Sequence, residues 1–446
     1  MLTGILFGLA PALRSMQLDV LPALKEEPRL PVPGAAGRGW WRTGSALVIA
    51  QVALSVVVLA GAGLMARTLR NLRDVNPGFR SENLLTFGID PTLTGFNGNR
   101  LGQFYRELRE QFGAIPGVLS AGYSDVPLLS EGWFVTGFRL EGKPEKHTAD
   151  VLAVGPGFFA AMGMPILAGR EFTAEEYTAM TWEPGAPCRT AERNNTPVAV
   201  VVNEAFTRTY FPGANPVGRR FGGGADSLYP ATEGCSNPGW EIVGVTRDAK
   251  YGDLRTEIHP TLYEPDGQGG IFELRTAGDP RAVVATVRAV LQHSGYDLPL
   301  YDVKTQTQII DELLFQERLL AQLSAFFAFL ALLLASIGVH GLLSYEVTQG
   351  TREIGIRMAL GAQRGDVLLR VVLRGITLVG IGAAAGTAAA LASTRFLESL
   401  LFGVKPADPL TLGVVVLLLL GVAAAACTVP ARRATRVDPL IALRYE

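Results

Sequence analysis

The chain has 446 residues, of which 48% are hydrophobic and 18% are charged, so it is too apolar for an ordinary soluble protein and too charged to lie wholly in a bilayer. We therefore expect one part to cross a membrane and another to fold in water. The formal net charge of -1 provides no basic excess, which argues against nucleic acid as a partner.

Four apolar runs are long enough, at about 20 residues each, to cross the hydrocarbon core of a membrane as helices. We predict transmembrane helices at residues 43–66, 319–345, 367–395 and 410–430. Gln51 and His340 lie within these runs, and for both a hydrogen bond between helices is favoured over a role in transport. Gly382 and Gly386, with alanines between them, form a small-xxx-small pattern that permits close helix packing.

The polar stretch between the first and second spans, residues 67–318, has the pattern of a mixed α+β domain. Apolar residues at helical spacing from Leu101 to Ile115 predict a helix that ends before Pro116. Asp279 is expected to cap a helix over the residues that follow it. Patterns typical of β-strands lie at residues 134–140, 198–202, 240–245 and 271–275.

A further helix is predicted over residues 305–317, and it is expected to run without a break into the second span. Such a continuous helix would carry a motion of the outer domain into the membrane.

Arginines in short segments predict the orientation of a membrane protein, because cytoplasmic loops carry an excess of Lys and Arg. Two segments are rich in arginine: Arg352, Arg357 and Arg364 follow the second span, and Arg432, Arg433, Arg436 and Arg444 follow the fourth. Beyond Arg395, the loop between the third and fourth spans has only Lys405. We therefore predict that residues 346–366 and the tail at 431–446 are cytoplasmic and that residues 396–409 lie outside.

The domain at residues 67–318 is then also outside. Arg67, Arg70 and Arg73, directly after the first span, disagree with this orientation. We follow the later segments, because a long domain contributes little to the charge rule.

The chain has three cysteines. Cys188 and Cys235 lie in Pro- and Gly-rich sequence of the outer domain, where a disulfide and two free thiols are about equally favoured interpretations. Cys427 lies in the last span and is interpreted as a small apolar residue.

A repeat relates the two ends of the chain. The sequence PALRSMQLDVLPALKEE from Pro11 aligns without gaps with PARRATRVDPLIALRYE from Pro430. The apolar stretch at residues 1–13 is too short to cross a bilayer and lacks the basic region of a signal peptide. We therefore expect residues 1–27 to be the tail of an earlier copy of the same module and residues 28–42 to be a cytoplasmic linker. The chain is then the second half of a duplicated protein, or a reading frame that begins late.

The segment TREIGIRMALGA, from Thr351 to Ala362, is a polar interruption between two apolar runs and the part of the sequence most informative about function. A short charged segment between two spans is a surface that a soluble partner can bind. The alternative is an amphipathic helix that lies on lipid headgroups, with its arginines setting the topology. The pattern alone leaves these two interpretations about equal.

One span, a large outer domain, three further spans and this segment resemble the FtsX-like and MacB-like permease family of ABC transporters, over nearly the whole chain. The sequences PVAVVVNEAFTRTYFPGANPVGRRF from Pro197 and WEIVGVTRDAKYGDLR from Trp240 resemble the periplasmic core domain of MacB-type permeases. The terminal repeat resembles the duplicated orphan permeases, of which this chain would be the C-terminal module. The expected fold class is a multi-pass α-helical membrane protein with four transmembrane helices and a large α+β extracytoplasmic domain between helices 1 and 2.

The resemblance implies a permease in the cytoplasmic (inner) membrane, with its large domain on the periplasmic side. It implies mechanotransmission, in which ATP hydrolysis by a cytoplasmic ABC ATPase moves the outer domain and drives export of a substrate that the sequence does not identify. The residues implied to dock on the ATPase are Arg352, Glu353, Ile354, Gly355, Ile356, Arg357, Met358 and Gly361, with the isoleucines and the methionine as apolar contacts and the charges setting register. Other implied partners are a second permease module, either a homodimer or an upstream paralogous half, a periplasmic adaptor and membrane lipid.

Signatures of an enzyme or of a nucleotide site are missing from the sequence. Gly142-Lys143 is followed by Pro144 and does not fit the frame GxxxxGK[ST], so energy is expected from another chain. Ser124 lacks the second glycine of a nucleophile elbow, and the four histidines lack metal-like spacing. No catalytic, cofactor-binding or metal-binding residue is predicted. Two other functions stay open: an ATPase-coupled regulator of a cell-wall hydrolase, and a stand-alone membrane sensor.

Overall fold

The computed structural model describes residues 35–91, 96, 98–130, 132, 134–181, 185–223, 235–266, 269–294, 298–360, 363–397, 400–405 and 408–434. The repeat at residues 1–27 and nearly all of the tail at 431–446 lie outside these ranges. The chain divides into two compact units, one made of Met1–Val56, Ala331–Ala389 and Val416–Glu446 and the other of Val57–Leu330 and Ala390–Val415.

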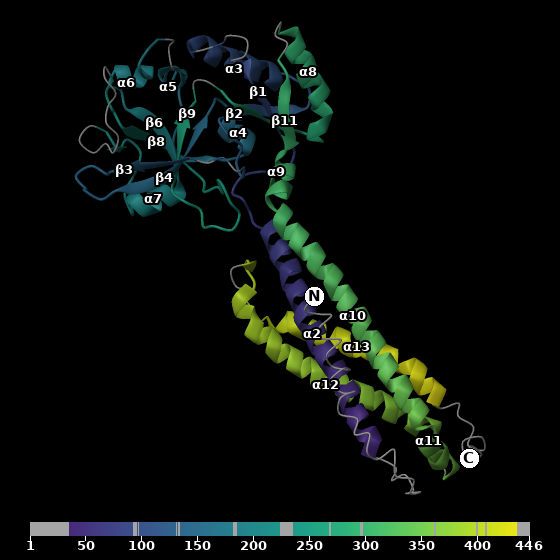
Figure 1. Cartoon of the computed structure of the whole chain (residues 1–446). Coiled ribbons are helices and arrows are strands. Elements are labelled where there is room, and N and C mark those ends of the chain that lie inside the picture. The colour runs from purple at the N-terminus through teal and green to yellow at the C-terminus, as the bar shows by residue number, and fades with distance from the viewer. Residues whose placement is uncertain are drawn as a thin grey trace. The chain divides into compact units, whose positions relative to one another are not determined.

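Within the described residues, four helices are long and apolar enough to cross a membrane (Figure 1). They are α2 (Ala35–Arg73), α10 (Phe315–Gln349), α12 (Arg364–Leu397) and α13 (Pro409–Ala434). The predicted fold class, four spans with an α+β domain between the first two, is confirmed. With 39 and 35 residues, α2 and α10 are longer than the apolar runs that predicted them.

The first unit is held by apolar packing between the four long helices. A buried cluster joins all of them: Val48, Val52, Ala335, Val339, Leu343, Val379, Ala423 and Cys427. The predicted close packing at Gly382 and Gly386 is confirmed, because a Cβ at Gly386 would lie 2.6 Å from the carbonyl oxygen of Ala53 on α2. The predicted hydrogen bond of His340 is also confirmed, since its Nδ1 lies 3.2 Å from the carbonyl oxygen of Ala426 on α13.

The domain between α2 and α10 is built on a mixed sheet that has 11 strands within the described residues. The order is β11-β1-β10-β2-β4-β9-β6-β8-β5, with β3 beside β4 and β7 beside β8. The β4–β9 and β6–β8 pairs are parallel and the others antiparallel. The strands are β1 (Leu84–Ile89), β2 (Val118–Ser124), β3 (Phe134–Phe138), β4 (His147–Val154), β5 (Ile166–Gly169), β6 (Val198–Asn203), β7 (Arg220–Phe221), β8 (Trp240–Thr246), β9 (Thr261–Pro265), β10 (Ile271–Thr276) and β11 (Leu300–Thr305).

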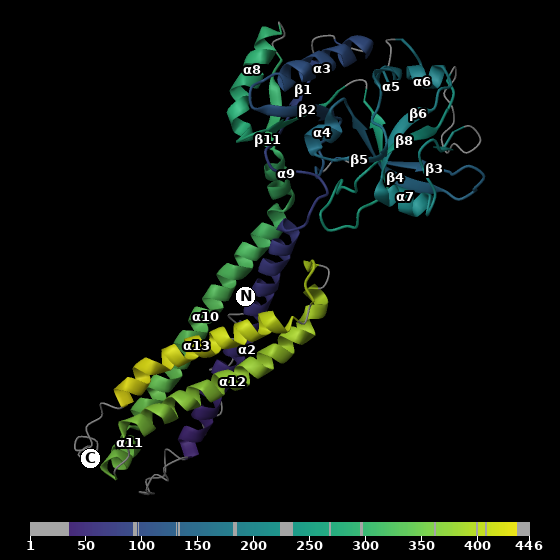
Figure 2. The same cartoon turned by 180° about the vertical axis from the view of Figure 1, so that it is seen from behind.

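Short helices cover the sheet. They are α3 (Gly98–Gly113), α4 (Phe158–Met162), α5 (Ala174–Ala179), α6 (Thr190–Arg193), α7 (Glu204–Tyr210), the 3-10 turn η4 (Pro280–Val283), α8 (Val284–His293) and α9 (Gln306–Leu313). Figure 2 shows α3 and α8 beside β1, β2 and β11, where Phe112 of α3 and Val287 of α8 enter one core cluster with Phe272 of β10. The four predicted strands and the helices predicted from Leu101 and after Asp279 are confirmed.

One connection differs from the sequence prediction. The helix expected over residues 305–317 is divided: α9 ends at Leu313, Leu314 leaves helical geometry with a ψ of 12°, and α10 begins at Phe315. The side chain of Leu314 is buried in a core cluster of the domain, so tertiary packing sets this break.

Cys188 and Cys235 are joined by a disulfide across 47 residues of sequence, and their Cα atoms are 6.3 Å apart. Cys427 is free and buried.

Candidate functional site

The segment singled out in the sequence is a short helix. α11 (Thr351–Ala359) follows α10 after Gly350, and the amide of Ile354 donates to the Gly350 carbonyl at 2.9 Å. The hydroxyl of Thr351 donates to the Val347 carbonyl at 3.0 Å, which ties the first turn of α11 to the end of α10. The predicted loop at residues 346–366 is therefore mostly helical.

The start of α12 is stabilised by its own first turn. The amide of Gln363 donates to Oδ2 of Asp366 at 3.2 Å, and the amide of Asp366 donates to the Gln363 carbonyl at 3.0 Å. A carboxylate in the first turn also interacts favourably with the helix dipole. These bonds fix the start of α12 at Arg364.

The two faces of α11 have different surroundings. Ile354 and Met358, four residues apart, pack against the buried Val347 and Val367 of the flanking helices. Ile356 is 41% exposed and Leu360, directly after α11, is 83% exposed. Of the three apolar contacts expected from the sequence, only Ile356 lies on the open face. Leu360 was missed, although its place four residues after Ile356 is a signal that helical spacing could have provided.

The remaining predicted residues have mixed positions. Gly355 is buried and Arg357 is exposed on α11. The side chains of Arg352 and Glu353, and Gly361 as a whole, lie outside the described residues.

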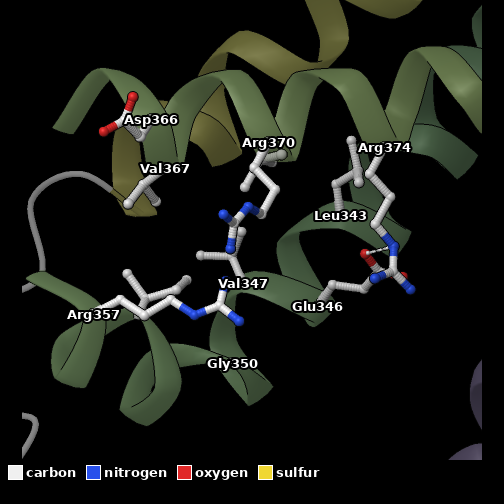
Figure 3. A pocket seen from close by; sticks show the side chains of 11 residues that line it. Leu343, Glu346, Val347, Gly350, Arg357, Asp366, Val367, Arg370 and Arg374 are labelled. Carbon is white, nitrogen blue, oxygen red and sulfur yellow. Dashed lines mark ion pairs between the residues drawn. The ribbon is translucent and has the colours of Figure 1, made fainter. Parts of the chain in front are cut away.

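Helices α10, α11 and α12 enclose a cavity of about 210 Å³. Figure 3 shows that the side chains of Arg357 and Arg370 both extend toward the space beside Val347. Arg374, one turn further along α12, forms an ion pair with Glu346 at 2.9 Å. Arg370, Arg374 and Glu346 were not predicted as site residues. A carboxylate directly after the second predicted span, and arginines inside the third, were the available signal.

A second group of polar contacts lies within the unit formed by Val57–Leu330 and Ala390–Val415. It joins the outer domain to those ends of the long helices that belong to the same unit. Arg255, in the loop between β8 and β9, contacts Oε1 of Glu317 in the first turn of α10 through Nη2 at 3.0 Å and Nε at 3.2 Å. It also donates to the carbonyl oxygen of Leu400, after α12, at 3.4 Å. The side chains of Arg255 and Glu317 are 29% and 20% exposed, so this pair is partly shielded from water.

The segment after α12 is also attached to α2. The side-chain amide of Asn71 donates to the carbonyl oxygens of Phe402 and Gly403, at 3.2 and 3.0 Å. The ring of Phe402 packs against the core cluster that contains Leu314. Arg67 of α2 pairs with Asp408 just before α13. We name the contacts of Arg255, Asn71, Phe402 and Arg67 the junction.

A buried carboxyl group lies in the sheet of the outer domain. Glu273 of β10 is 1% exposed, and burial raises its pKa to about 8, with a further increase from Asp125. The hydroxyl of Ser124 lies within hydrogen-bond distance of both the Val126 carbonyl, at 2.8 Å, and Oε1 of Glu273. A hydroxyl has one proton, so Ser124 donates to one of these two oxygens at a time, and a protonated Glu273 would donate to Ser124 in its turn. Burial and the proximity of Asp266 raise the pKa of Asp125 to about 7.

Comparison with known proteins shows which proteins this chain is similar to. Residues 325–439 match the family described as FtsX-like permease C-terminal. The macrolide export ATP-binding/permease protein MacB of Sodalis glossinidius is 23% identical over 428 residues, which are 91% of this chain and 58% of that protein. Residues 325–439 thus resemble the FtsX-like permeases, and the chain as a whole is similar to MacB. MacB of Chromobacterium violaceum is 24% identical over 90% of this chain and 57% of its own length.

The chain spans about half the length of the curated relatives that it matches first. Among solved structures, the periplasmic region of MacB from Actinobacillus actinomycetemcomitans matches with a TM-score of 0.31 and 14% identity. That match covers 55% of this chain and 97% of the MacB region.

Proposed function

We propose that this permease couples ATP hydrolysis by a cytoplasmic ABC ATPase to movement of its outer domain, for export of a substrate. Its relatives are named as ATP-binding/permease proteins, and the permease aligns with about half of their length. The sequence of residues 1–446 contains no GxxxxGK[ST] frame, so we assign ATP hydrolysis to a partner.

The observation that carries this proposal is the junction. A mechanical transmitter needs contacts that make the domain follow the helices, and coupling of this kind passes through contiguous packed or hydrogen-bonded groups. Arg255 of the domain contacts both the first turn of α10 and the carbonyl oxygen of Leu400 after α12. A displacement of either helix end therefore acts directly on the loop between β8 and β9.

The open face of α11, at the end of α10 that is far in sequence from the junction, supports an ATPase as the partner. Ile356 and Leu360 are large apolar side chains, 41% and 83% exposed. Exposed apolar anchors of this kind are usual in a protein-binding surface. In this scheme Ile354 and Met358 support α11 from inside and do not contact the partner.

The sidedness of the proposal follows from charge and redox chemistry. Arg357, Arg370 and Arg374 cluster at one end of the spans, which favours the cytoplasmic side for α11. The disulfide of Cys188 and Cys235 favours an oxidising compartment for the outer domain, and the periplasm is such a compartment.

The test is photo-crosslinking in native membranes from a reactive amino acid placed at position 360 or 356. We expect both positions to capture an ABC ATPase, identified by mass spectrometry of its nucleotide-binding peptides. Position 354 is the matched control, because its side chain packs inside and should capture only this chain. Lipid adducts alone from positions 360 and 356 would instead favour a stand-alone sensor whose α11 lies on the headgroups.

A further inference from the structure

We propose that the cavity between α10, α11 and α12 binds the phosphate group of an anionic phospholipid headgroup. This inference does not depend on the ATPase, because the cavity is formed by this chain alone and lies on the inner side of α11.

The cationic side chains that line the cavity come from two helices. Arg357 belongs to α11, and Arg370 and Arg374 belong to α12. Figure 3 shows the guanidinium groups of Arg357 and Arg370 directed into the same space beside Val347. An anion that enters this space is attracted by both guanidinium groups. A phosphate group also matches the planar donor geometry of a guanidinium.

The two carboxylates of the cavity already have other roles. Glu346 is 8% exposed in its side chain and pairs with Arg374 at 2.9 Å. Asp366 accepts from the amide of Gln363 and so caps α12. Neither lies between Arg357 and Arg370 in Figure 3, where the dashed line joins Glu346 and Arg374. Among the side chains that the structure describes, no carboxylate forms an ion pair with Arg370.

The position along the helices selects a lipid as the source of the phosphate. The apolar stretches of α10 and α12 that can cross a membrane end at Gln349 and begin at Gly365, so the cavity lies where headgroups are expected. Leu369 and Leu373, next in sequence to Arg370 and Arg374, are 56% and 51% exposed. A headgroup held by Arg370 would leave its acyl chains beside these leucines. Basic pockets between transmembrane helices on the cytoplasmic side bind anionic headgroups in this way.

The size of the cavity agrees with a small ligand group. Its volume of about 210 Å³ is below the roughly 300–1,000 Å³ of pockets for drug-sized molecules. It can hold a phosphate with part of a headgroup, while the acyl chains stay outside.

The experiment is a native mass spectrometry titration of the purified full chain in detergent, with phosphatidylglycerol and phosphatidylcholine compared at equal concentrations. We expect the wild-type chain to retain phosphatidylglycerol preferentially. The variant R370Q should weaken this preference by about fivefold, the effect of one basic residue near an anionic lipid. R370K keeps the charge and should retain most of the preference, which separates loss of charge from a failure to fold.

The matched control is R432Q, which removes an exposed arginine at the end of α13 that does not line the cavity. We expect R432Q to keep the wild-type preference. Equal weakening in R432Q and R370Q would overturn the proposal, because net charge alone would then explain the binding. So would equal retention of the two lipids by the wild-type chain. Binding of inorganic phosphate that is lost in R370Q, with no preference for phosphatidylglycerol in the wild-type chain, would assign the cavity to a soluble phosphate compound and exclude the lipid as its ligand.

Discussion

Single arginines explain why the charge rule was ambiguous for this chain. Arg67, Arg70 and Arg73 follow the first span and opposed the predicted orientation. Each of them has a carboxylate partner: Asp408 for Arg67, Asp74 at 3.8 Å for Arg70, and Asp311 at 3.7 Å for Arg73. Their charges contribute to local ion pairs in the folded protein, but the charge rule counts Lys and Arg alone, so it is the length of the domain after the first span that makes them weak markers of topology.

At the same scale, Glu273→Gln tests whether the buried carboxyl group is protonated. A carboxyl whose pKa is higher in the folded state than its ordinary value of 4.5 stabilises the fold fully below pH 4.5. This stability is lost as the pH rises through about 8, the pKa of folded Glu273. Glutamine stays neutral and can donate to Ser124, so the variant should match the wild type at pH 5 and be more stable by about 2–4 kcal/mol at pH 9.

The measurement is thermal unfolding of the purified chain from pH 5 to 9. Glu107→Gln is the control, since Glu107 is exposed on α3. A Glu273→Gln variant less stable than the wild type at every pH would show that the carboxyl is ionised in the fold.

At the scale of elements, the contact between α2 and α12 depends on two glycines. A Cβ at Gly386 would lie 2.6 Å from the Ala53 carbonyl oxygen and 2.7 Å from Cβ of Val56, and a Cβ at Gly382 would lie 2.8 Å from Cβ of Val52. These distances are far below van der Waals contact, and backbone atoms of α2 cannot yield as the end of a flexible side chain does. Glycine at both positions therefore sets how closely the helices approach.

Gly386→Ala is expected to separate α2 from α12 and to cost about 1–3 kcal/mol, the usual range for overpacking. Gly380→Ala is the matched control on the same helix, because a Cβ there has no atom within 4 Å. Alanine favours the helix more than glycine does, so the control should unfold at the same or a slightly higher temperature. The measurement is the melting temperature of each variant in detergent. Equal melting temperatures for the two variants would contradict the close contact between α2 and α12.

At the scale of the whole molecule, the disulfide and the junction constrain different parts of the outer domain. Cys188 and Cys235 close a long loop, and such a bond stabilises mainly by restricting the unfolded chain. The junction instead restrains the folded domain against the helix ends that it contacts, through Arg255 and Asn71. The disulfide thus stabilises the domain, whereas the junction connects the domain to the helix ends.

Labelling with a large maleimide tests the disulfide and the compartment together. Protein denatured without reductant should carry one label, on Cys427, and three labels after reduction, in agreement with the three cysteines of the sequence. Replacing Cys188 and Cys235 by serine should lower the stability of the domain by about 3–4 kcal/mol, as expected for a loop of 47 residues. Three labels without reductant would mean that the bond does not form in the cell, and Cys427→Ser, which removes the free thiol, is the control for the single label.

Features that depend on neighbouring residues were predictable from the sequence. Four apolar runs predicted the spans, and helical spacing or β-branched runs predicted α3, α8, β6 and β8, because burial imposes its period on consecutive residues. The small-xxx-small pattern of Gly382 and Gly386 likewise predicted close packing, although not the partner helix.

The candidate site was predicted only in part. The segment after the second span was selected for its charges, yet its pattern did not separate Ile356 on the open face from Ile354 and Met358 inside. That division depends on Val347 and Val367, which belong to other helices.

By itself, the sequence determined the membrane class, the four spans and the place of the α+β domain, because hydrophobicity and periodicity are local properties of a chain. Only the tertiary structure decided the break at Leu314, the arginines of the cavity and the junction. Arg255 meets Glu317 across 62 residues and Leu400 across 145. Contacts over such separations arise from how the whole chain packs, and no local pattern encodes them.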